Sequence, residues 1–245
     1  MESSRLSFED YVQHIVHQNK GKRIHHFEYH GQYFWIKQPE VLSLGWRLLK
    51  PYPEQAFQNE MKTLKSFAQL AAPVPKLLIS RPDFFVLEDA GPTLADWMEN
   101  PSISVQQKQQ ILSEGVKALV ALHHQGLAHG RPAIRDMAWN GEQIRFIDLE
   151  NHMENQPTKQ VQDVMIFMHS LCRSKVISDQ EVKRVIAELA QQSAPSIWQQ
   201  VIVQLRKYRF IYYLLLPFKP IAKTDLIAIY RLFENMSDQL KRKVE

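Results

Sequence analysis

The sequence predicts an α+β fold, with strands in the first part of the chain and helices in the rest. Segments before residue 91 are short and rich in β-branched and aromatic residues, whereas later segments repeat apolar residues at helical spacing. Gly91-Pro92 marks a connector between the two parts. We therefore expect a single domain over 1–245, with a small lobe over about 1–90, a helical lobe over about 91–245 and a cleft between them.

Local signals delimit the elements of the first part. Ser7 is suited to cap a helix, and His30-Gly31 forms a turn that divides an aromatic segment into two strands. Phe57, Met61 and Leu64 recur at helical spacing. The expected elements are a helix over 7–18, two strands within 22–38, an irregular connection over 39–53, a helix over 54–71, and two short strands, 76–79 and 84–87.

The second part is expected to be mostly helical. Ser104-x-x-Gln107 is a capping box that begins a long helix. A loop after this helix leads to a short strand over 143–149, which ends close to Asp148. The helices are expected over 93–99, over 104–125 and, in several pieces, over 160–240.

Composition narrows the class of protein without selecting a partner. Of the 245 residues, 44% are hydrophobic and 23% charged, which is typical of a globular protein. The net charge of +4 permits an anionic partner such as a nucleotide, a phosphosugar, a nucleic acid or a membrane surface. It does not distinguish among them.

Cysteine usage and apolar runs indicate the compartment. Cys172 is the single cysteine, so no internal disulfide can form and a cysteine-ligated zinc site is not expected. Its apolar neighbours predict a buried structural thiol. The first residues lack the regions of a signal peptide, and the longest apolar stretch, Phe210–Phe218, is too short to span a bilayer. We expect a cytoplasmic location.

Lys37 and Glu60 are charged residues in apolar surroundings. Lys37 ends an aromatic strand, and Glu60 follows the helical spacing of Phe57 and Leu64. Burying either charge alone is costly, whereas a pair is tolerated. Each side chain could instead reach solvent, but the two together favour an ion pair.

Two further features contain candidate functional groups. Asp148 follows buried strand residues, a position that suits a cation site or a turn cap. The segment 127–139 packs polar residues into a loop bracketed by apolar ones, and such loops are usually functional. Its candidate residues are His129, Arg131, Arg135 and Asp136.

The order of these features resembles the protein-kinase superfamily. Lys37, Glu60 on a helix, the hinge-like segment 84–91, His129-Gly130 and Ile147-Asp148 occur in the order of that superfamily. The resemblance covers about residues 22–175. It is closest to the bacterial group of lipopolysaccharide kinases, Kdo kinases, RIO-like kinases and aminoglycoside phosphotransferases. It implies a bilobal kinase-like fold that binds ATP and Mg²⁺.

The resemblance also assigns roles to residues. Lys37 would hold the α- and β-phosphates and Glu60 would orient it, while residues 86–90, with Glu88 and Ala90, would contact adenine. The remaining implied roles are Mg²⁺ binding for Asp148, organisation of the loop for His129, and structural support of that loop's backbone for Asp163.

The catalytic loop departs from the kinase pattern. Arg131 stands where the family has its aspartate base, and Asp136 stands where it has asparagine. A guanidinium cannot accept a proton. Asp136 could join Asp148 in a two-carboxylate Mg²⁺ site or act as the base, and Arg131 and Arg135 could neutralise a phosphorylated substrate.

Two other family motifs are altered. The glycine-rich loop that holds phosphate in the family is poorly matched, because few glycines precede Lys37. The Asp-Phe-Gly tripeptide is replaced by Asp148-Leu-Glu150, in which Glu150 could add a metal ligand or be solvated. These departures leave open how the phosphates are held.

The expected function is ATP- and Mg²⁺-dependent phosphoryl transfer to a hydroxyl of a lipopolysaccharide-core sugar, another small molecule or a protein. A catalytically impaired pseudokinase that binds nucleotide or acts as a scaffold is the alternative. Acceptor, nucleotide preference and oligomeric state do not follow from the sequence.

The stretch from Arg206 to Lys219 mixes basic and aromatic residues. Nucleic-acid binding is one interpretation, but a core helix with a solvated basic face is preferred. The same stretch and Leu44–Lys50 could alternatively rest on the inner face of a membrane.

Overall fold

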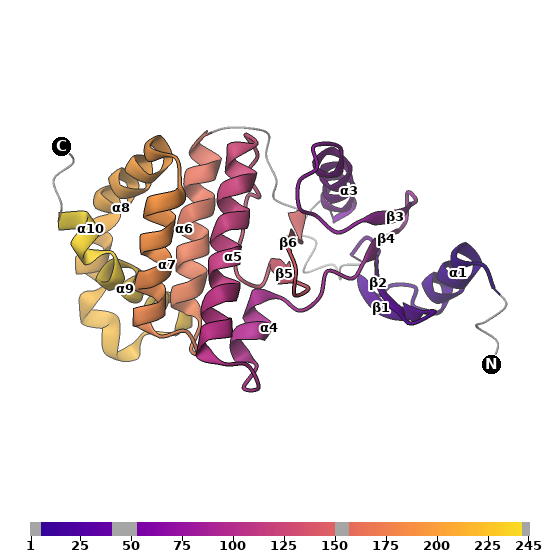
Figure 1. The fold of residues 1–245 in the computed structure, drawn as a ribbon, viewed down its shortest axis with the longest axis horizontal. Helices are drawn as coiled ribbons and strands as arrows, with labels where there is room; N and C mark the ends of the chain where they lie inside the picture. Colours follow the sequence, from indigo (N-terminus) through magenta and orange to yellow (C-terminus); the bar gives the residue numbers. More distant parts are fainter. Residues whose placement is uncertain (1–5, 41–52, 150–156, 242–245) are drawn as a thin grey trace. The chain divides into compact units, whose positions relative to one another are not determined.

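The computed structural model of the chain describes residues 6–40, 53–149 and 157–241 (Figure 1). It divides into two compact units. The first unit is Met1–Ala90 with Asp148–Glu150, and the second is Gly91–Ile147 with Asn151–Glu245. The predicted α+β class is confirmed, because the first unit contains a four-stranded sheet with helices and the second unit is mostly helical.

The first unit contains, among its described residues, a four-stranded antiparallel sheet in the order β1-β2-β4-β3. His30 and Gly31 both have positive φ, at 50° and 76°, as a two-residue hairpin turn between β1 and β2 requires. The elements of this unit are α1 (Phe8–Gln18), β1 (Ile24–Tyr29), β2 (Gln32–Lys37), α3 (Pro53–Gln69), β3 (Leu77–Ser80) and β4 (Phe85–Glu88).

The two faces of β2 differ, because side chains alternate along a strand. Phe34 and Ile36 are buried and pack with Val12 and Ile15 of α1. Lys37 belongs to the opposite face. On that face α3 covers the neighbouring strand β4, where Phe57 of α3 stacks on Phe85 with ring centroids 5.1 Å apart.

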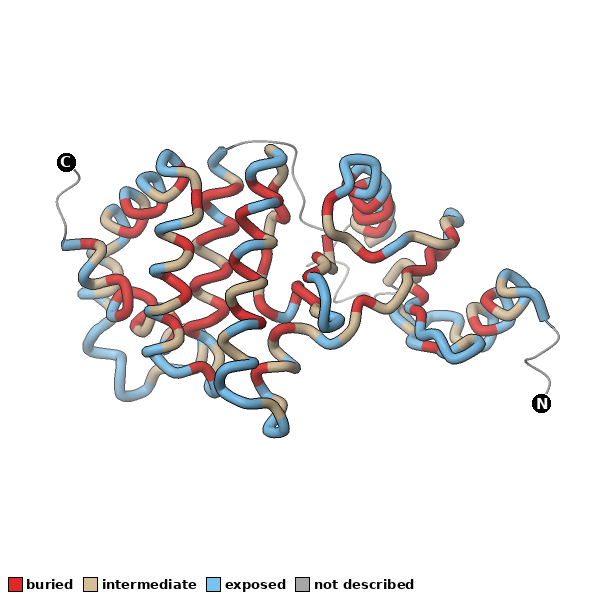
Figure 2. Tube along the Cα trace, viewed as in Figure 1, coloured by how far each residue is buried: buried red, intermediate tan, exposed pale blue. Residues whose placement is uncertain are grey.

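The second unit is a group of helices with a small two-stranded sheet, β5-β6, among its described residues. The buried positions concentrate along the facing sides of α5, α6 and α7 (Figure 2). The elements are α4 (Leu94–Glu99), α5 (Val105–His124), β5 (Met137–Trp139), β6 (Ile144–Phe146), α6 (Pro157–Arg173), α7 (Asp179–Gln192), α8 (Pro195–Leu215), the 3₁₀ helix η2 (Leu216–Ile221), α9 (Thr224–Asn235) and α10 (Ser237–Lys241).

Helix starts follow the predicted capping signals. Ser7 accepts a hydrogen bond from the Asp10 backbone N–H, and Ser104 with Gln107 forms the predicted capping box. Near Gly115, α5 comes so close to α4 that an added Cβ would lie 2.8 Å from Leu94 Cδ2. A small residue therefore lets these two helices pack.

The structure differs from the expected elements at two strands, and one expected segment cannot be compared. The strand expected over 143–149 is shorter, because β6 ends at Phe146 and Asp148 has a φ of 62° that a strand does not accommodate. Strand β5 was not expected, since three residues are too few to show a periodic pattern. Most of the expected irregular connection, including Leu44–Lys50, lies outside the described residues.

The interpretation of the stretch from Arg206 as a core helix is wrong. Within α8, all of whose residues are described, the buried positions are Ile197, Val201, Ile202 and Leu205. None of the described residues of its second half is buried, and Tyr208, Phe210, Tyr213 and Leu214 are exposed, so this part of the helix contributes little to the core.

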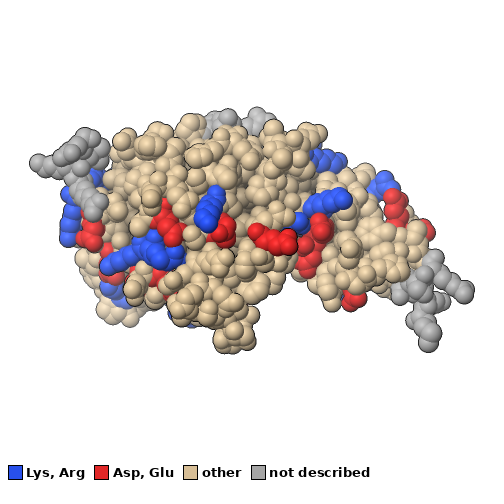
Figure 3. Space-filling view, in the orientation of Figure 1, with Lys and Arg blue, Asp and Glu red and all other residues tan. Residues whose placement is uncertain are grey.

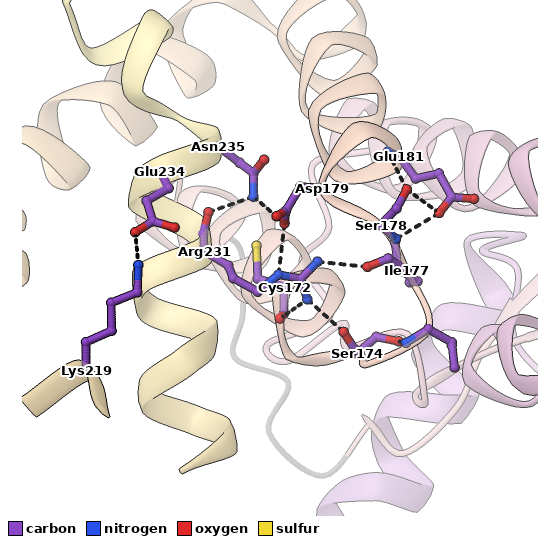
Figure 4. A network of polar contacts seen from close by, with 11 residues as sticks. Cys172, Ser174, Ile177, Ser178, Asp179, Glu181, Lys219, Arg231, Glu234 and Asn235 are labelled. Carbon is purple, nitrogen blue, oxygen red and sulfur yellow. Dashed lines mark hydrogen bonds and ion pairs between the residues drawn. The ribbon is translucent and has the colours of Figure 1, made fainter. Parts of the chain in front are cut away.

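A polar network joins α6, α7 and α9 (Figure 4). The Arg231 guanidinium donates to the carbonyls of Cys172, Ser174 and Ile177, which lie at the end of α6 and in the loop after it. It also pairs with Asp179 at 2.9 Å. The Cys172 side chain is buried, as predicted, and burial raises the pKa of its thiol from 9.0 to about 12. The thiol therefore stays protonated at neutral pH and is not a nucleophile.

Candidate functional site

The ion pair predicted between Lys37 and Glu60 is present in the first unit. Lys37 Nζ lies 2.5 Å from Glu60 Oε1, and the Glu60 side chain is only 3% exposed. Lys37 is the last residue of β2, and Glu60 lies on the apolar side of α3. Two desolvated opposite charges compensate each other here, as neither could alone.

Asp148 belongs to the same unit and approaches the same lysine. Its Oδ1 lies 3.7 Å from Lys37 Nζ, a distance for an ion pair rather than a hydrogen bond. Its left-handed backbone conformation is one that aspartate tolerates better than most residues. Lys37 is therefore close to one buried carboxylate and to one that is 28% exposed.

Exposed aromatic side chains lie on the same face of β2 as Lys37. Trp35 is 36% and Tyr33 50% exposed. The His26 ring lies 4.3 Å from the Trp35 ring and 5.2 Å from that of Tyr33, and its Nε2 is 2.9 Å from Asp89 Oδ2. None of these residues was predicted to be functional, although the alternation along β2 places Tyr33 and Trp35 on the face of Lys37.

The hinge-like segment continues from β4. The Glu88 backbone N–H donates to the Lys76 carbonyl at 3.0 Å, and the Asp89 N–H donates to the Tyr33 carbonyl at 3.0 Å. These bonds join Glu88 and Asp89 to the chain segments on either side of β4. Ala90, which is predicted with Glu88 to contact adenine, follows them and is buried.

Asp163 holds the loop that follows α5 in the second unit. Its fully buried carboxylate accepts hydrogen bonds from the backbone N–H groups of His129, at 2.7 Å, and Gly130, at 2.9 Å. The His123 ring lies 3.2 Å from the same carboxylate. Gln160, one turn earlier on α6, donates to the carbonyls of His123 and Leu127. Helix α6 thus determines the path of this loop.

His129 connects the loop to the residue before Asp148. Its Nδ1 accepts from the Arg131 backbone N–H at 3.2 Å, so the neutral ring carries its hydrogen on Nε2. Nε2 lies 3.0 Å from the Ile147 carbonyl and therefore donates to it. The ring is fully buried, which suits an organising residue rather than a base.

Asp136 is buried beside two arginines. Its Oδ2 is 3.8 Å from Arg131 Nε, and its Oδ1 is 3.7 Å from Arg135 Nε. The Asp136 backbone is also fixed, since its carbonyl accepts from the Ile147 N–H and its N–H donates to the Ala133 carbonyl. Both guanidinium groups remain partly exposed, at 39% for Arg131 and 57% for Arg135.

The predicted site residues thus fall into two groups, one in each unit. Lys37, Glu60 and Asp148 come together in the first unit. The loop residues and Asp163 come together in the second. These are His129, Arg131, Arg135, Asp136 and Asp163.

The carboxylates can be compared with the needs of Mg²⁺, which usually takes one or two protein carboxylates and completes its shell with water and phosphate oxygens. Asp148 offers a partly exposed carboxylate of this kind. Asp136 is less suited, because two guanidinium groups lie near its oxygens.

Glu150, the other predicted acidic ligand, lies outside the described residues. Over 6–40, 53–149 and 157–241, no group of three or more His, Cys, Asp or Glu side chains could hold a metal ion. Asp148 is thus a described residue that would fit a magnesium ion whose other ligands are water and phosphate oxygens.

Comparisons with known proteins place the chain in a family. No family model matches the sequence. The crystal structure of WbdD is similar with a TM-score of 0.46 and 15% identity, over 74% of this chain and 48% of the WbdD chain, so the chain spans about half the length of that protein. An uncharacterized protein of Haemophilus influenzae is 44% identical over 229 residues, which cover 93% of this chain and 95% of the relative. The chain belongs to the same family as this Haemophilus influenzae protein.

Proposed function

We propose that the protein is an ATP- and Mg²⁺-dependent phosphotransferase that acts on a hydroxyl group. The observation that carries this proposal is the position of Lys37, whose Nζ lies 2.5 Å from Glu60 and 3.7 Å from Asp148. Glu60 fixes the lysine, which keeps further N–H donors for phosphate oxygens. Asp148 supplies a carboxylate for the metal. Mg²⁺, when bound, would neutralise charge on the phosphate groups.

The open face of β2 supports nucleotide binding in the same unit. Trp35 and Tyr33 present aromatic surface beside the lysine, and the backbone of Glu88 and Ala90 would hydrogen-bond the base. Stacking on aromatic rings is tolerant of base identity. This arrangement leaves the choice between adenine and guanine to the hinge backbone.

The loop of the second unit would act on the acceptor. Phosphoryl transfer depends mainly on positioning and on stabilising charge, so the missing aspartate base does not exclude activity. Arg131 and Arg135 would stabilise negative charge, and Asp136 would accept the hydroxyl proton. The resemblance to the lipopolysaccharide-kinase group favours a lipopolysaccharide-core sugar as the acceptor, with other small molecules and proteins as further candidates.

A pseudokinase is the second candidate function. It is favoured by the two arginines that flank Asp136, because they compete for the oxygens that would accept a proton or bind metal. Such a protein would bind nucleotide without transferring phosphate.

Phosphate transfer from radiolabelled ATP tests the proposal, with bacterial lipopolysaccharide, monosaccharides and water as acceptors. We expect Mg²⁺-dependent turnover that Asp148→Asn lowers by about 100-fold or more, since a charge-stabilising group is lost. Asp83→Asn, on an exposed turn of the same unit, is the matched control and should retain activity. Nucleotide binding without turnover would instead identify a pseudokinase, and the absence of both would exclude the two functions.

A further inference from the structure

A cavity of about 600 Å³ lies within the second unit, beside the loop that carries Asp136. It is lined by residues of α4, of the loop around Ile134, of α6 and the segment after it, and of the start of α9. Its basic side chains are Arg131, Arg135, His169, Arg173 and Lys175. Side chains from two parts of the unit, the loop around Ile134 and the end of α6 with the segment after it, thus bring positive charge to one cavity.

Acidic groups offset part of this charge. Glu99 and Asp225 also line the cavity, and Asp225 Oδ1 accepts a hydrogen bond from Arg173 Nε at 2.5 Å. Asp136 lies behind Arg131 and Arg135. Among the described residues at this cavity, four permanent cations therefore meet three carboxylates, and positive charge is in surplus even when His169 is neutral.

The guanidinium groups are placed to bind a ligand as well as these carboxylates. The contacts of Arg131 and Arg135 with Asp136 are 3.8 Å and 3.7 Å long, beyond hydrogen-bond distance, and both side chains are partly exposed. Guanidinium forks match the oxygens of phosphate and carboxylate groups. The cavity is thus better suited to an anion than to an apolar or neutral ligand.

We propose that this cavity binds a phosphate or carboxylate group of the acceptor, so that the enzyme phosphorylates an acceptor that is already anionic. That the bound anion belongs to an acceptor rests on the proposed phosphotransferase function, whereas the binding of an anion in this cavity does not. Arg131 would then contribute at the usual base position by holding the substrate. Asp136, which both loop arginines contact, would remain the group near the reacting hydroxyl.

Isothermal titration with glucose, glucose 6-phosphate and glucuronate tests the cavity. We expect the wild-type protein to bind an anionic sugar and not glucose, and the two anions separate phosphate from carboxylate preference. Arg135→Gln and Arg173→Gln should each weaken binding by about 10-fold or more, because each removes a charge-assisted hydrogen bond. Arg209→Gln, on α8 outside the cavity, is the control and should bind as the wild type does.

The outcomes separate this inference from the proposed function. Asp148 does not line the cavity. The Asp148→Asn variant should therefore still bind the anion, although it loses ATP turnover. Anion binding that survives both cavity variants, or no preference for an anionic sugar over glucose, would overturn the inference. Melting temperatures of the variants show whether a loss of binding reflects unfolding.

A second, independent feature is an exposed surface at the end of α8 and in η2. Phe210, Tyr213 and Leu214 share one side of the helix, and Phe218 and Ile221 follow in η2. Their exposed fractions range from 51% for Phe218 to 78% for Ile221. Several large exposed apolar residues close together in the chain are typical of an interaction site.

Basic residues accompany these apolar ones. Lys207 lies next to Tyr208, Arg209 lies over the Tyr213 ring at 5.5 Å, and Lys219 and Lys223 flank Ile221. On the face shown in Figure 3, basic and acidic side chains occur in small mixed groups. Apolar and aromatic residues flanked by lysine and arginine are complementary to a bilayer with anionic lipids.

We infer that this surface, formed by Phe210, Tyr213, Leu214, Phe218 and Ile221, attaches the protein peripherally to an anionic membrane. Every helix in the described part of the chain is too short or too polar to cross a bilayer, so the contact would be superficial. A membrane-bound location would bring the protein to acceptors that are anchored in lipid.

Co-sedimentation with vesicles tests the surface. We expect binding to vesicles that contain phosphatidylglycerol, weaker binding to phosphatidylcholine alone, and loss of binding by about 10-fold or more in Phe210→Ser/Ile221→Ser, because burial of two large side chains is removed. Val176→Ser, at a position that is 52% exposed elsewhere in the unit, is the control. Failure of the wild type to bind anionic vesicles would overturn the inference, as would dimerisation in solution that the double variant abolishes.

Discussion

The Lys37 ammonium group and the Glu60 carboxylate form an ion pair that is largely shielded from solvent. We predict that Lys37→Met lowers the free energy of unfolding by about 3–5 kcal/mol, since it leaves a buried charge without its partner. The double variant Lys37→Met/Glu60→Leu should lose much less, because it removes both charges. Urea unfolding of the single and double variants measures the coupling, and strictly additive effects would show that the pair is not coupled.

Individual residues of the site differ in how well the sequence predicts them. Lys37 and Glu60 interrupt apolar patterns, and a charge in such a pattern needs a partner. The exposure of Trp35 was not predictable, since its strand alone does not say which face another element covers. The contacts of Asp136 with Arg131 and Arg135 depend on the path of an irregular loop, for which no periodic signal exists.

Among the elements, α6 positions the candidate catalytic loop through several side chains, of which Asp163 bonds directly to the backbone of His129 and Gly130. We predict that Asp163→Asn destabilises the protein by about 1–3 kcal/mol or more, because one backbone N–H of His129 or Gly130 then faces an amide N–H₂ instead of an acceptor. Hydrogen exchange should speed up selectively at these two amides. Unchanged protection there would mean that the loop is held by other contacts.

The elements also differ in how clearly the sequence specifies them. Helices α5 and α1 begin at side-chain caps that the sequence displays, so their starts agree with expectation. The second half of α8 shows a helical pattern of apolar residues, yet the pattern does not say whether its apolar side meets protein or another partner. Strand β5 depends on pairing with β6 rather than on its own three residues.

At the scale of the whole molecule, the two units would divide the work. The first unit carries the lysine, its two neighbouring carboxylates and the aromatic face of β2, which would bind the nucleotide. The second unit carries the braced loop, the basic cavity and the exposed surface of α8, which would bind the acceptor and its surroundings. The α+β class follows from the sequence, because the change from alternating to helical patterns at residue 91 involves many residues and does not depend on any one of them.

Titration of the wild-type protein with ATP, with and without Mg²⁺, tests most directly whether the lysine and its carboxylates form a nucleotide site. We predict Mg²⁺-dependent binding that Asp148→Asn weakens by about 10-fold or more, through loss of a charge-assisted metal contact. The Asp83→Asn control should bind as the wild type does. Absence of binding, or binding that neither Mg²⁺ nor Asp148→Asn alters, would contradict a phosphate and magnesium site at Lys37, Glu60 and Asp148.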